Sequence, residues 1–240
     1  MDNAVDIRLL AYEHADLGRM YGFLIHNKAR GRTFAVDVGN DSVYLAALEA
    51  EGWQLDSILL THHHHDHVAR AGALKAQTGA TIRGPKGLKD VDEALSPGYL
   101  ADLDVEVIAT PGHTRDMLNY YLPSARAYFA GDTLFTLGCG RLFEGTPEMM
   151  FDSLQKIKAL PPETAIYGAH EWTLTHLEFA LSQFPDHAPL RQREPLIRAI
   201  CAKGAPTIPS LLQDELQTNP FLLAKNVQEF ARLRATKDAF

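Results

Sequence analysis

Seven histidine and aspartate side chains stand at spacings that suit metal binding. Four of them lie in Thr61–His67, where four consecutive histidines are followed by aspartate and histidine. Within this run, His62, His64, Asp66 and His67 form the pattern H-x-H-x-D-H. A tight loop with this spacing can give two imidazoles to one ion and a carboxylate plus an imidazole to its neighbour. A purification tag is the alternative, but tags lie at termini and carry no aspartate between histidines.

Four ligands are too few for two ions, and the chain offers three more candidates. These are His113 after Pro111-Gly112, Asp132 after Gly131, and His170 after Gly168-Ala169. Each follows a run of residues typical of a β-strand. Singly, a histidine or aspartate after such a glycine is more often a turn residue than a ligand. In this order, behind the first motif, the three together favour a site for two metal ions.

The elements that position these residues change character along the chain. The first two-thirds alternates strand-like runs with helices, whereas the last third shows no strand pattern, which predicts an α/β domain followed by a helical one. The predicted strands are Phe34–Val38, Ser57–Leu60, Glu106–Ala109, Leu118–Leu122, Ala127–Ala130 and Ala165–Tyr167. The predicted helices are Ser42–Glu51, Pro147–Leu160 with Thr146 as its N-cap, Trp172–Gln183, Pro189–Lys203, Ser210–Leu216 and Val227–Ala235.

Composition narrows the class of protein. The 240 residues are 46% hydrophobic and carry a net charge of -7, which argues against nucleic acid or an anionic membrane as the main partner. The amino-terminal residues lack the features of a signal peptide, and no stretch is apolar for long enough to span a bilayer. We therefore expect a cytoplasmic protein. Separately, we expect a monomer. Cys139 and Cys201 are too few for a disulfide framework and are expected to be free thiols.

The metal motifs resemble those of the metallo-β-lactamase superfamily, whose fold is an αββα sandwich with a dinuclear site at one edge of two packed sheets. The resemblance implies an α/β fold of this kind. It also implies that Asp37 orients a ligand without touching metal. The ligand set that it implies is His62, His64 and His113 for the first ion, Asp66, His67 and His170 for the second, and Asp132 bridging both.

Further segments resemble one family within that superfamily, glyoxalase II (hydroxyacylglutathione hydrolase). They are Gly131–Phe135, Gly138–Thr146, Gly168–Thr173, Asn219–Leu222 and Phe230–Phe240. This resemblance implies a catalytic domain over residues 1–171 and a smaller all-helical, glutathione-binding domain over residues 172–240. The implied reaction is hydrolysis of S-D-lactoylglutathione to D-lactate and glutathione, the second step of methylglyoxal detoxification.

The same resemblance implies which residues contact the glutathione thioester: Arg141, Phe143, His170, Trp172, Arg234 and Lys237. Three of them depart from the family pattern, which often has Lys for Arg141, Tyr for Phe143 and Tyr for Trp172. The cationic and aromatic character is kept, but two phenolic hydroxyls are lost. Spacing alone favours a solvated helix face for Arg234 and Lys237, and the resemblance reverses that interpretation.

The expected cofactors are two divalent metal ions, zinc foremost, although His/Asp sets also accept iron and manganese. Such ions lower the pKa of a bridging water and polarise a carbonyl, so Asp66 and Asp132 are the expected catalytic residues. The main rival is another chemistry on the same scaffold, either a persulfide dioxygenase with one iron or a different thioester or lactone hydrolase. A metal-binding protein without turnover is the alternative from another class.

Overall fold

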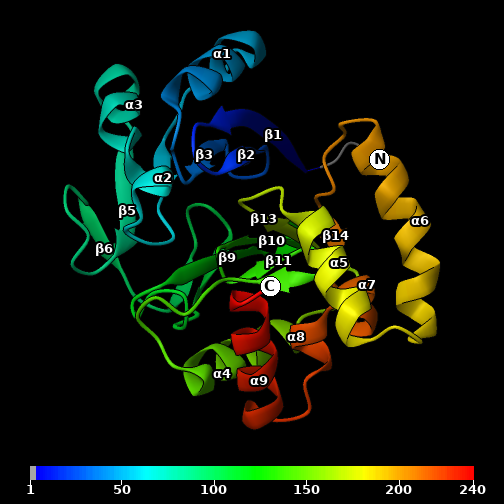
Figure 1. The fold of residues 1–240 in the computed structure, drawn as a ribbon. Helices are drawn as coiled ribbons and strands as arrows, with labels where there is room; N and C mark the ends of the chain where they lie inside the picture. The colour runs from blue at the N-terminus through cyan, green and yellow to red at the C-terminus, as the bar shows by residue number, and fades with distance from the viewer. Residues whose placement is uncertain (1–3) are drawn as a thin grey trace. The chain divides into compact units, whose positions relative to one another are not determined.

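The computed structural model describes residues 4–240, which form two compact units (Figure 1). The first unit holds the residues up to Ala109 together with Asp116–Gly131. The second holds Thr110–Arg115 and Asp132–Phe240. Each unit therefore draws on two separate stretches of the chain. Among the described residues, no helix has the length and apolar character needed to cross a membrane.

A six-stranded sheet dominates the first unit. Its strands follow one another in chain order: β1 (Val5–His14), β2 (Gly18–Asn27), β3 (Arg32–Val36), β4 (Ser57–Leu59), β5 (Thr81–Pro85) and β6 (Glu93–Leu95). The pairs β1–β2 and β2–β3 are antiparallel, whereas β3 to β6 pair in parallel. Helices α1 (Asp41–Glu51) and α3 (Ala71–Thr78) make the first two parallel crossovers, as parallel pairing requires.

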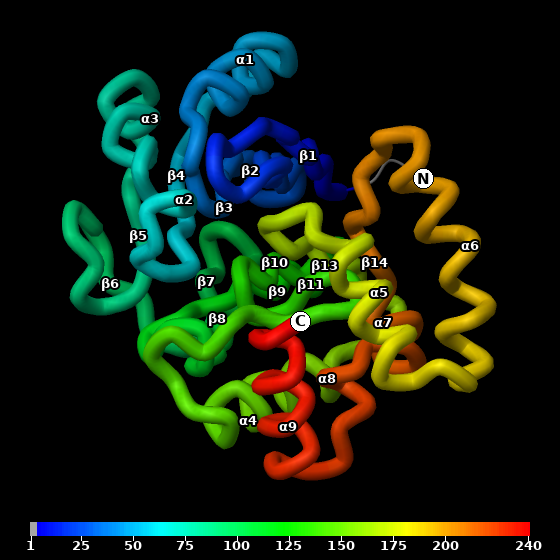
Figure 2. The backbone as a smooth tube through the Cα atoms, viewed as in Figure 1, coloured from blue at the N-terminus to red at the C-terminus, as the bar shows by residue number. Residues whose placement is uncertain are grey.

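A second, antiparallel sheet in the same unit faces the first. It runs β7 (Gly98–Leu100), β8 (Val105–Ala109), β9 (Leu118–Leu122) and β10 (Ala127–Gly131). The rings of Phe23 and Phe129 meet between the sheets at 5.3 Å, and the Tyr120 hydroxyl donates to the Leu60 backbone oxygen at 2.5 Å. On the other face of the first sheet, α1 and α3 lie side by side (Figure 2). Leu48 of α1 belongs to the buried apolar cluster of this face. The unit thus has a helix–sheet–sheet layering.

The second unit is mostly helical. Its helices are α4 (Pro147–Lys158), α5 (Thr173–Gln183), α6 (Ala188–Ala202), α7 (Leu212–Thr218), α8 (Pro220–Leu223) and α9 (Val227–Asp238). Its short strands pair as β11 (Leu134–Phe135) with β12 (Gly138–Cys139), and as β13 (Ala165–Gly168) with β14 (Ser210–Leu211). Helix α9 packs against α4 and α8 (Figure 2), with the Phe230 ring beside those of Phe151 and Phe221.

All six predicted strands and the predicted helices over 42–51, 147–160, 172–183, 189–203 and 227–235 are confirmed to within a few residues. Thr146 is the N-cap of α4, since its side chain accepts from the Met149 backbone N–H. Two expectations are wrong. The last third does contain a strand, and the predicted helix Ser210–Leu216 begins as that strand, β14, before α7 starts at Leu212. Neither β1 nor β2 was among the predicted strands.

Candidate metal centre

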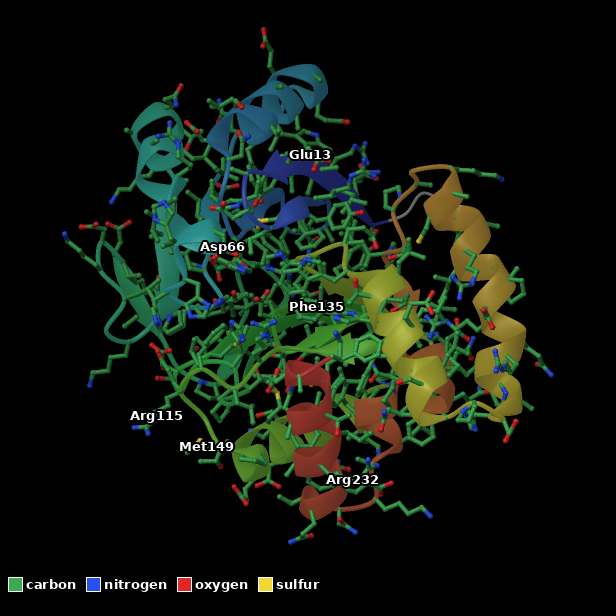
Figure 3. All side chains as sticks on the ribbon, in the orientation of Figure 1. Glu13, Asp66, Arg115, Phe135, Met149 and Arg232 are labelled. Carbon is green, nitrogen blue, oxygen red and sulfur yellow. The ribbon has the colours of Figure 1, made fainter. Side chains whose placement is uncertain are left out.

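In the first unit, the four motif residues gather directly after β4. The chain is extended through His64 and then forms the short helix α2 (His65–Val68), whose second residue, Asp66, is labelled in Figure 3. The imidazole of His62 lies 4.6 Å from that of His64 and 4.2 Å from that of His67, measured between ring centres. His62 and His67 are buried, whereas the other two are half-buried. His63 and His65 are exposed.

Asp37 holds this cluster from beneath. Its Oδ2 lies 2.7 Å from Nδ1 of His67, and its Oδ1 accepts from the Thr61 backbone N–H at 2.8 Å. The geometry is that expected of a residue that orients a ligating imidazole. Asp37 adopts a left-handed backbone with φ of 52°, which is uncommon outside glycine. The Tyr44 hydroxyl donates to its backbone oxygen at 2.5 Å, and this contact helps to keep the strained residue in place.

In the second unit, the three remaining candidates form a buried cluster. His113 Nε2 lies 3.4 Å from Oδ2 of Asp132, and His170 Nε2 lies 3.2 Å from Oδ1 of the same carboxylate. Each oxygen thus faces a different imidazole, which is compatible with the predicted sharing of Asp132 between two ions. His113 Nδ1 lies 2.9 Å from the backbone oxygen of Arg141. A carbonyl only accepts, so Nδ1 carries the hydrogen and Nε2 presents a lone pair.

These distances fit metal ligands. Two nitrogens on one tetrahedral zinc ion lie about 3.3–3.4 Å apart, because each bond is about 2.0–2.1 Å long. The nitrogen–oxygen spacings of 3.4 Å and 3.2 Å at Asp132 are close to that value, as is the 3.4 Å between Asp66 Oδ2 and His67 Nε2 in the first unit. Imidazole and carboxylate donors together suit zinc, iron and manganese. The residues of each unit therefore fit divalent metal ions.

Glycine is required where the backbone passes the ligands of the second unit. A Cβ atom on Gly140 would lie 2.0 Å from the Asp132 backbone oxygen and 2.9 Å from His113 Nδ1. A Cβ on Gly145 would lie 2.4 Å from the Gly112 oxygen. Any side chain at these positions would displace the segment that carries His113, so the glycines in Gly138–Gly145 have a steric reason.

The structure shows the surroundings of four predicted substrate-binding residues, whose role stays a prediction. The side chains of Arg141 and Phe143 are 67% and 62% exposed, and Phe143 meets His113 edge-on. Trp172 is half-buried and stacks on the imidazole of His170, with ring centres 4.1 Å apart and an angle of 9° between the planes. Lys237 is half-buried. Burial lowers the pKa of Lys237, and repulsion from the nearby positive charges of Arg234 and Arg141 lowers it further. A bound anion would offset this repulsion.

Arg234 differs from its neighbours. It is only 5% exposed, and its Nη1 donates to the Cys139 backbone oxygen at 2.8 Å while Nη2 donates to Asp238 at 2.9 Å. The guanidinium also lies 5.0 Å from the centre of the Phe221 ring. Much of its hydrogen-bonding capacity is therefore used within the protein. A contact between Arg234 and a glutathione carboxylate stays a prediction.

Sequence reasoning missed three residues beside the candidate ligands. His176 is buried against Phe135 (labelled in Figure 3), with the rings 5.7 Å apart, and burial lowers its pKa to about 3. It lies four residues after Trp172, one turn along α5, and that spacing could have identified it. Burial raises the pKa of Tyr12 to about 12, and the negative charges of Asp37 and Asp66 contribute to this increase. Thr61, the third, directly precedes the ligand motif.

The cysteines have no ligand role in this arrangement. Both are free, as predicted. Burial raises the pKa of the Cys139 thiol to about 11, so it stays protonated and unreactive at neutral pH.

Comparison with known proteins places the chain in a class. The model of the metallo-beta-lactamase superfamily matches residues 23–95 and 85–170, and that of the hydroxyacylglutathione hydrolase C-terminus matches residues 171–240. These matches define a hydrolase of the metallo-β-lactamase superfamily. The two family models meet at residues 170 and 171, whereas the compact units divide the chain at other places, so the domain boundary between residues 171 and 172 stays a prediction.

Curated relatives identify the family. A hydroxyacylglutathione hydrolase of Brucella anthropi is 43% identical over 92% of this chain and 93% of its own. One of Acidiphilium cryptum is 48% identical over 88% of this chain and 89% of its own. The chain belongs to the hydroxyacylglutathione hydrolase family, as the sequence motifs indicated.

Solved structures confirm the predicted fold. The chain is similar to ETHE1 from Myxococcus xanthus, with a TM-score of 0.73 and 23% identity over 96% of this chain and 90% of that one. It is similar to the BLEG-1 B3 metallo-beta-lactamase, with a TM-score of 0.69 and 18% identity over 91% and 100%. TTHA1623, crystallised in a di-iron-bound form, is 25% identical over 67% and 91%, with a TM-score of 0.60. At these identities the first two show the fold alone.

Proposed function

We propose that this protein hydrolyses S-D-lactoylglutathione to D-lactate and glutathione with the help of two divalent metal ions. Within the family shown by the comparisons, one structural observation carries the proposal. Asp132 offers each of its carboxylate oxygens to a different buried imidazole, those of His113 and His170. A single carboxylate between two ligand sets is what a pair of ions needs, and paired ions are common in hydrolytic enzymes.

The proposed ligand assignment follows the superfamily pattern. His62, His64 and His113 hold the first ion, and Asp66, His67 and His170 hold the second, with Asp132 shared. The spacings inside each unit support this assignment. Zinc is the proposed occupant, and the di-iron form of TTHA1623 supports iron as an alternative.

These residues would hold two ions, which when bound would lower the pKa of a shared water so that hydroxide is available at neutral pH, and would polarise the thioester carbonyl. Asp66 is half-buried, and its carboxylate would orient this hydroxide toward the thioester carbonyl while it ligates the second ion. Attack breaks the carbon–sulfur bond, so that the acyl group leaves as D-lactate and the sulfur as glutathione thiolate. A thiol has a pKa of about 8.5, so the thiolate leaves readily and no strong general acid is required.

Residues of the second unit are proposed to bind the glutathione part. Lys237 and the exposed Arg141 supply positive charge for its carboxylates. Phe143 and Trp172 supply apolar surface beside His113 and His170. Trp172 keeps one indole N–H as a donor, whereas Phe143 has none in place of the family's phenolic hydroxyl.

The proposed setting is the cytoplasm, with a small glutathione thioester as the partner and the chain acting as a monomer. The net charge of -7 supports the absence of nucleic acid and anionic membrane from the partners.

The direct test is a comparison of three activities of the purified protein. We expect S-D-lactoylglutathione to be hydrolysed with a higher kcat/KM than a β-lactam, and no oxygen uptake with glutathione persulfide. Oxygen uptake that exceeds thioester hydrolysis would instead support the persulfide dioxygenase. Bound metal without turnover of any thioester would support a binding protein.

A further inference from the structure

The side chain of Thr61 lies between Asp37 and His62 in the first unit. Its hydroxyl Oγ1 is 2.8 Å from Asp37 Oδ2 and 2.9 Å from His62 Nδ1. Thr61 and His62 are fully buried, and Asp37 is 5% exposed. Bulk water therefore does not compete for these hydrogen bonds, and the positions of their hydrogens follow from the protein groups.

The hydroxyl has one hydrogen to give, and the chemistry of its neighbours decides where it points. Asp37 in its carboxylate form can only accept, so the hydrogen of Thr61 points at Oδ2. The remaining lone pair of Oγ1 then faces His62 Nδ1. That nitrogen must carry a hydrogen, because the reverse arrangement would set two lone pairs against each other at 2.8 Å.

The same carboxylate oxygen also receives His67. Nδ1 of His67 lies 2.7 Å from Asp37 Oδ2, so this imidazole too carries its hydrogen on Nδ1. In a neutral imidazole the other nitrogen, Nε2, then presents a lone pair. Asp37 acts on His67 directly and on His62 through the threonine hydroxyl.

We propose that Thr61 is a positioning residue. Its hydroxyl donates its hydrogen to Asp37 and accepts a hydrogen bond from Nδ1 of His62. This relay of two hydrogen bonds leaves the Nε2 lone pair of His62 available to a metal ion. One buried carboxylate then prepares an imidazole for each of the two ions. This inference rests on the proposed metal-binding function.

The backbone holds the relay in register. The Thr61 N–H donates to Asp37 Oδ1 at 2.8 Å, and the Thr61 oxygen accepts from the Leu118 N–H at 2.9 Å. The Asp37 N–H donates to the Leu59 oxygen at 3.0 Å. These bonds fix both ends of the relay, so removal of the hydroxyl alone should leave the surrounding chain in place.

Thr61→Val removes the hydroxyl and keeps the shape of the side chain, whereas Thr61→Ser keeps the hydroxyl. Thr33→Val is a matched control. Thr33 is also buried in the first unit, and its Oγ1 lies 2.9 Å from Nδ1 of His26, which is not a proposed ligand. Asp37→Asn is the fourth variant, because an amide can donate where the carboxylate accepts and so disturbs both branches.

The first measurement is zinc retained by the full-length, zinc-loaded protein during competition with a chelator. We expect Thr61→Val to weaken the binding of one of the two ions by about 10–100-fold, which is the usual effect of removing a hydrogen-bond partner of a metal ligand. Thr61→Ser and Thr33→Val should keep both affinities near the wild-type values. Asp37→Asn should weaken both ions. Wild-type retention of both ions by Thr61→Val, or an equal loss in Thr61→Ser, would overturn the proposal.

The second measurement is nitrogen NMR of histidine-labelled, zinc-loaded protein. We expect an Nδ1-bound hydrogen on His62 that exchanges slowly with solvent in the wild type and much faster in Thr61→Val, with His67 unchanged. A hydrogen on Nε2 of His62 in the wild type would refute the relay. Neither measurement uses the thioester, so a failure of the proposed hydrolysis would leave the relay intact, and the reverse also holds.

Discussion

The guanidinium of Arg234 donates a hydrogen bond to the backbone oxygen of Cys139 at 2.8 Å and ties the last helix, α9, to strand β12. Gly140 follows Cys139 and packs against the backbone of Asp132. The oxygen of the next residue, Arg141, lies 2.9 Å from His113 Nδ1. Arg234 therefore supports the segment Cys139–Arg141, which lies beside two candidate ligands. Lys237, three residues further along the same helix, does not share this role.

This contact predicts different effects for the two cations of α9. Lys237→Ala should raise KM about tenfold and leave kcat nearly unchanged, because a contact with a glutathione carboxylate is present in both the ground state and the transition state. Arg234→Ala should instead lower the free energy of unfolding by about 1.5–3 kcal/mol, the range for a hydrogen bond to a charged group. Steady-state kinetics and thermal unfolding of both variants test this difference.

Salt and a smaller substrate provide the controls for Lys237. Added salt should raise the KM of the wild type, since exposed charge pairs are screened, and a thioester without the glutathione carboxylates should respond little to Lys237→Ala. An Arg234→Ala variant with wild-type thermal stability and a tenfold higher KM would show that Arg234 grips the substrate after all.

The metal content gives a second prediction. The purified protein should bind close to two divalent ions, and a strong chelator should abolish hydrolysis reversibly. Asp132→Asn should weaken both ions, because its carboxylate oxygens face His113 and His170 separately. His113→Gln should affect mainly one ion. Elemental analysis of the three proteins after identical dialysis measures the outcome, and equal loss in both variants would contradict a bridging role.

The strands that carry the candidate ligands were predictable from sequence because they are short, apolar and bounded by turn residues. Ser57–Leu59 is buried at each position, so its composition alone identifies it. The strand β1 was not predicted, because most of its residues are only half-buried. Half-buried positions accept polar residues, so Asp, Arg, Glu and His are interspersed with apolar residues in this strand. Such a mixture hides the alternation on which strand prediction depends.

The role of Arg234 could not be predicted for a different reason. Spacing places Arg234 and Lys237 on one face of a helix, but it does not say what that face meets. The acceptor of Arg234, Cys139, is 95 residues earlier in the chain. Only the tertiary fold brings the two together. The role of Thr61 was easier to predict from the sequence, since its neighbour His62 was already a candidate ligand.

The stacking of Trp172 on His170 gives a third prediction. An aromatic pair is worth about 0.5–1.5 kcal/mol beyond burial, so loss of the indole should free the imidazole and weaken the second ion by about 2–10-fold. We expect Trp172→Ala to show this loss under chelator competition. Trp172→Phe keeps a ring at the same position and should recover most of the affinity. If the phenylalanine variant is as poor as the alanine variant, the stack does not support His170.

The last prediction concerns acid stability and rests on His176. Burial lowers its pKa from 6.5 to about 3, while its Nδ1 lies 3.1 Å from the Thr136 backbone oxygen. The unfolded chain therefore takes up a proton near pH 6.5 that the folded protein refuses until about pH 3. Between these values the unfolded state binds more protons, so stability falls as pH falls, by at most about 1.4 kcal/mol per pH unit from this group.

The variant His176→Gln tests this, because its amide is neutral at every pH and can still donate toward Thr136. The difference in free energy of unfolding between wild type and variant should be constant above pH 7, where histidine is neutral in both states. It should then shift in favour of the variant by about 1.4 kcal/mol per unit as the pH falls from 6 to 4.5. Denaturant unfolding of both proteins in excess chelator removes the metal contribution from the comparison. Parallel stability curves over that range would mean that His176 gains its proton as readily in the folded protein as in the unfolded chain.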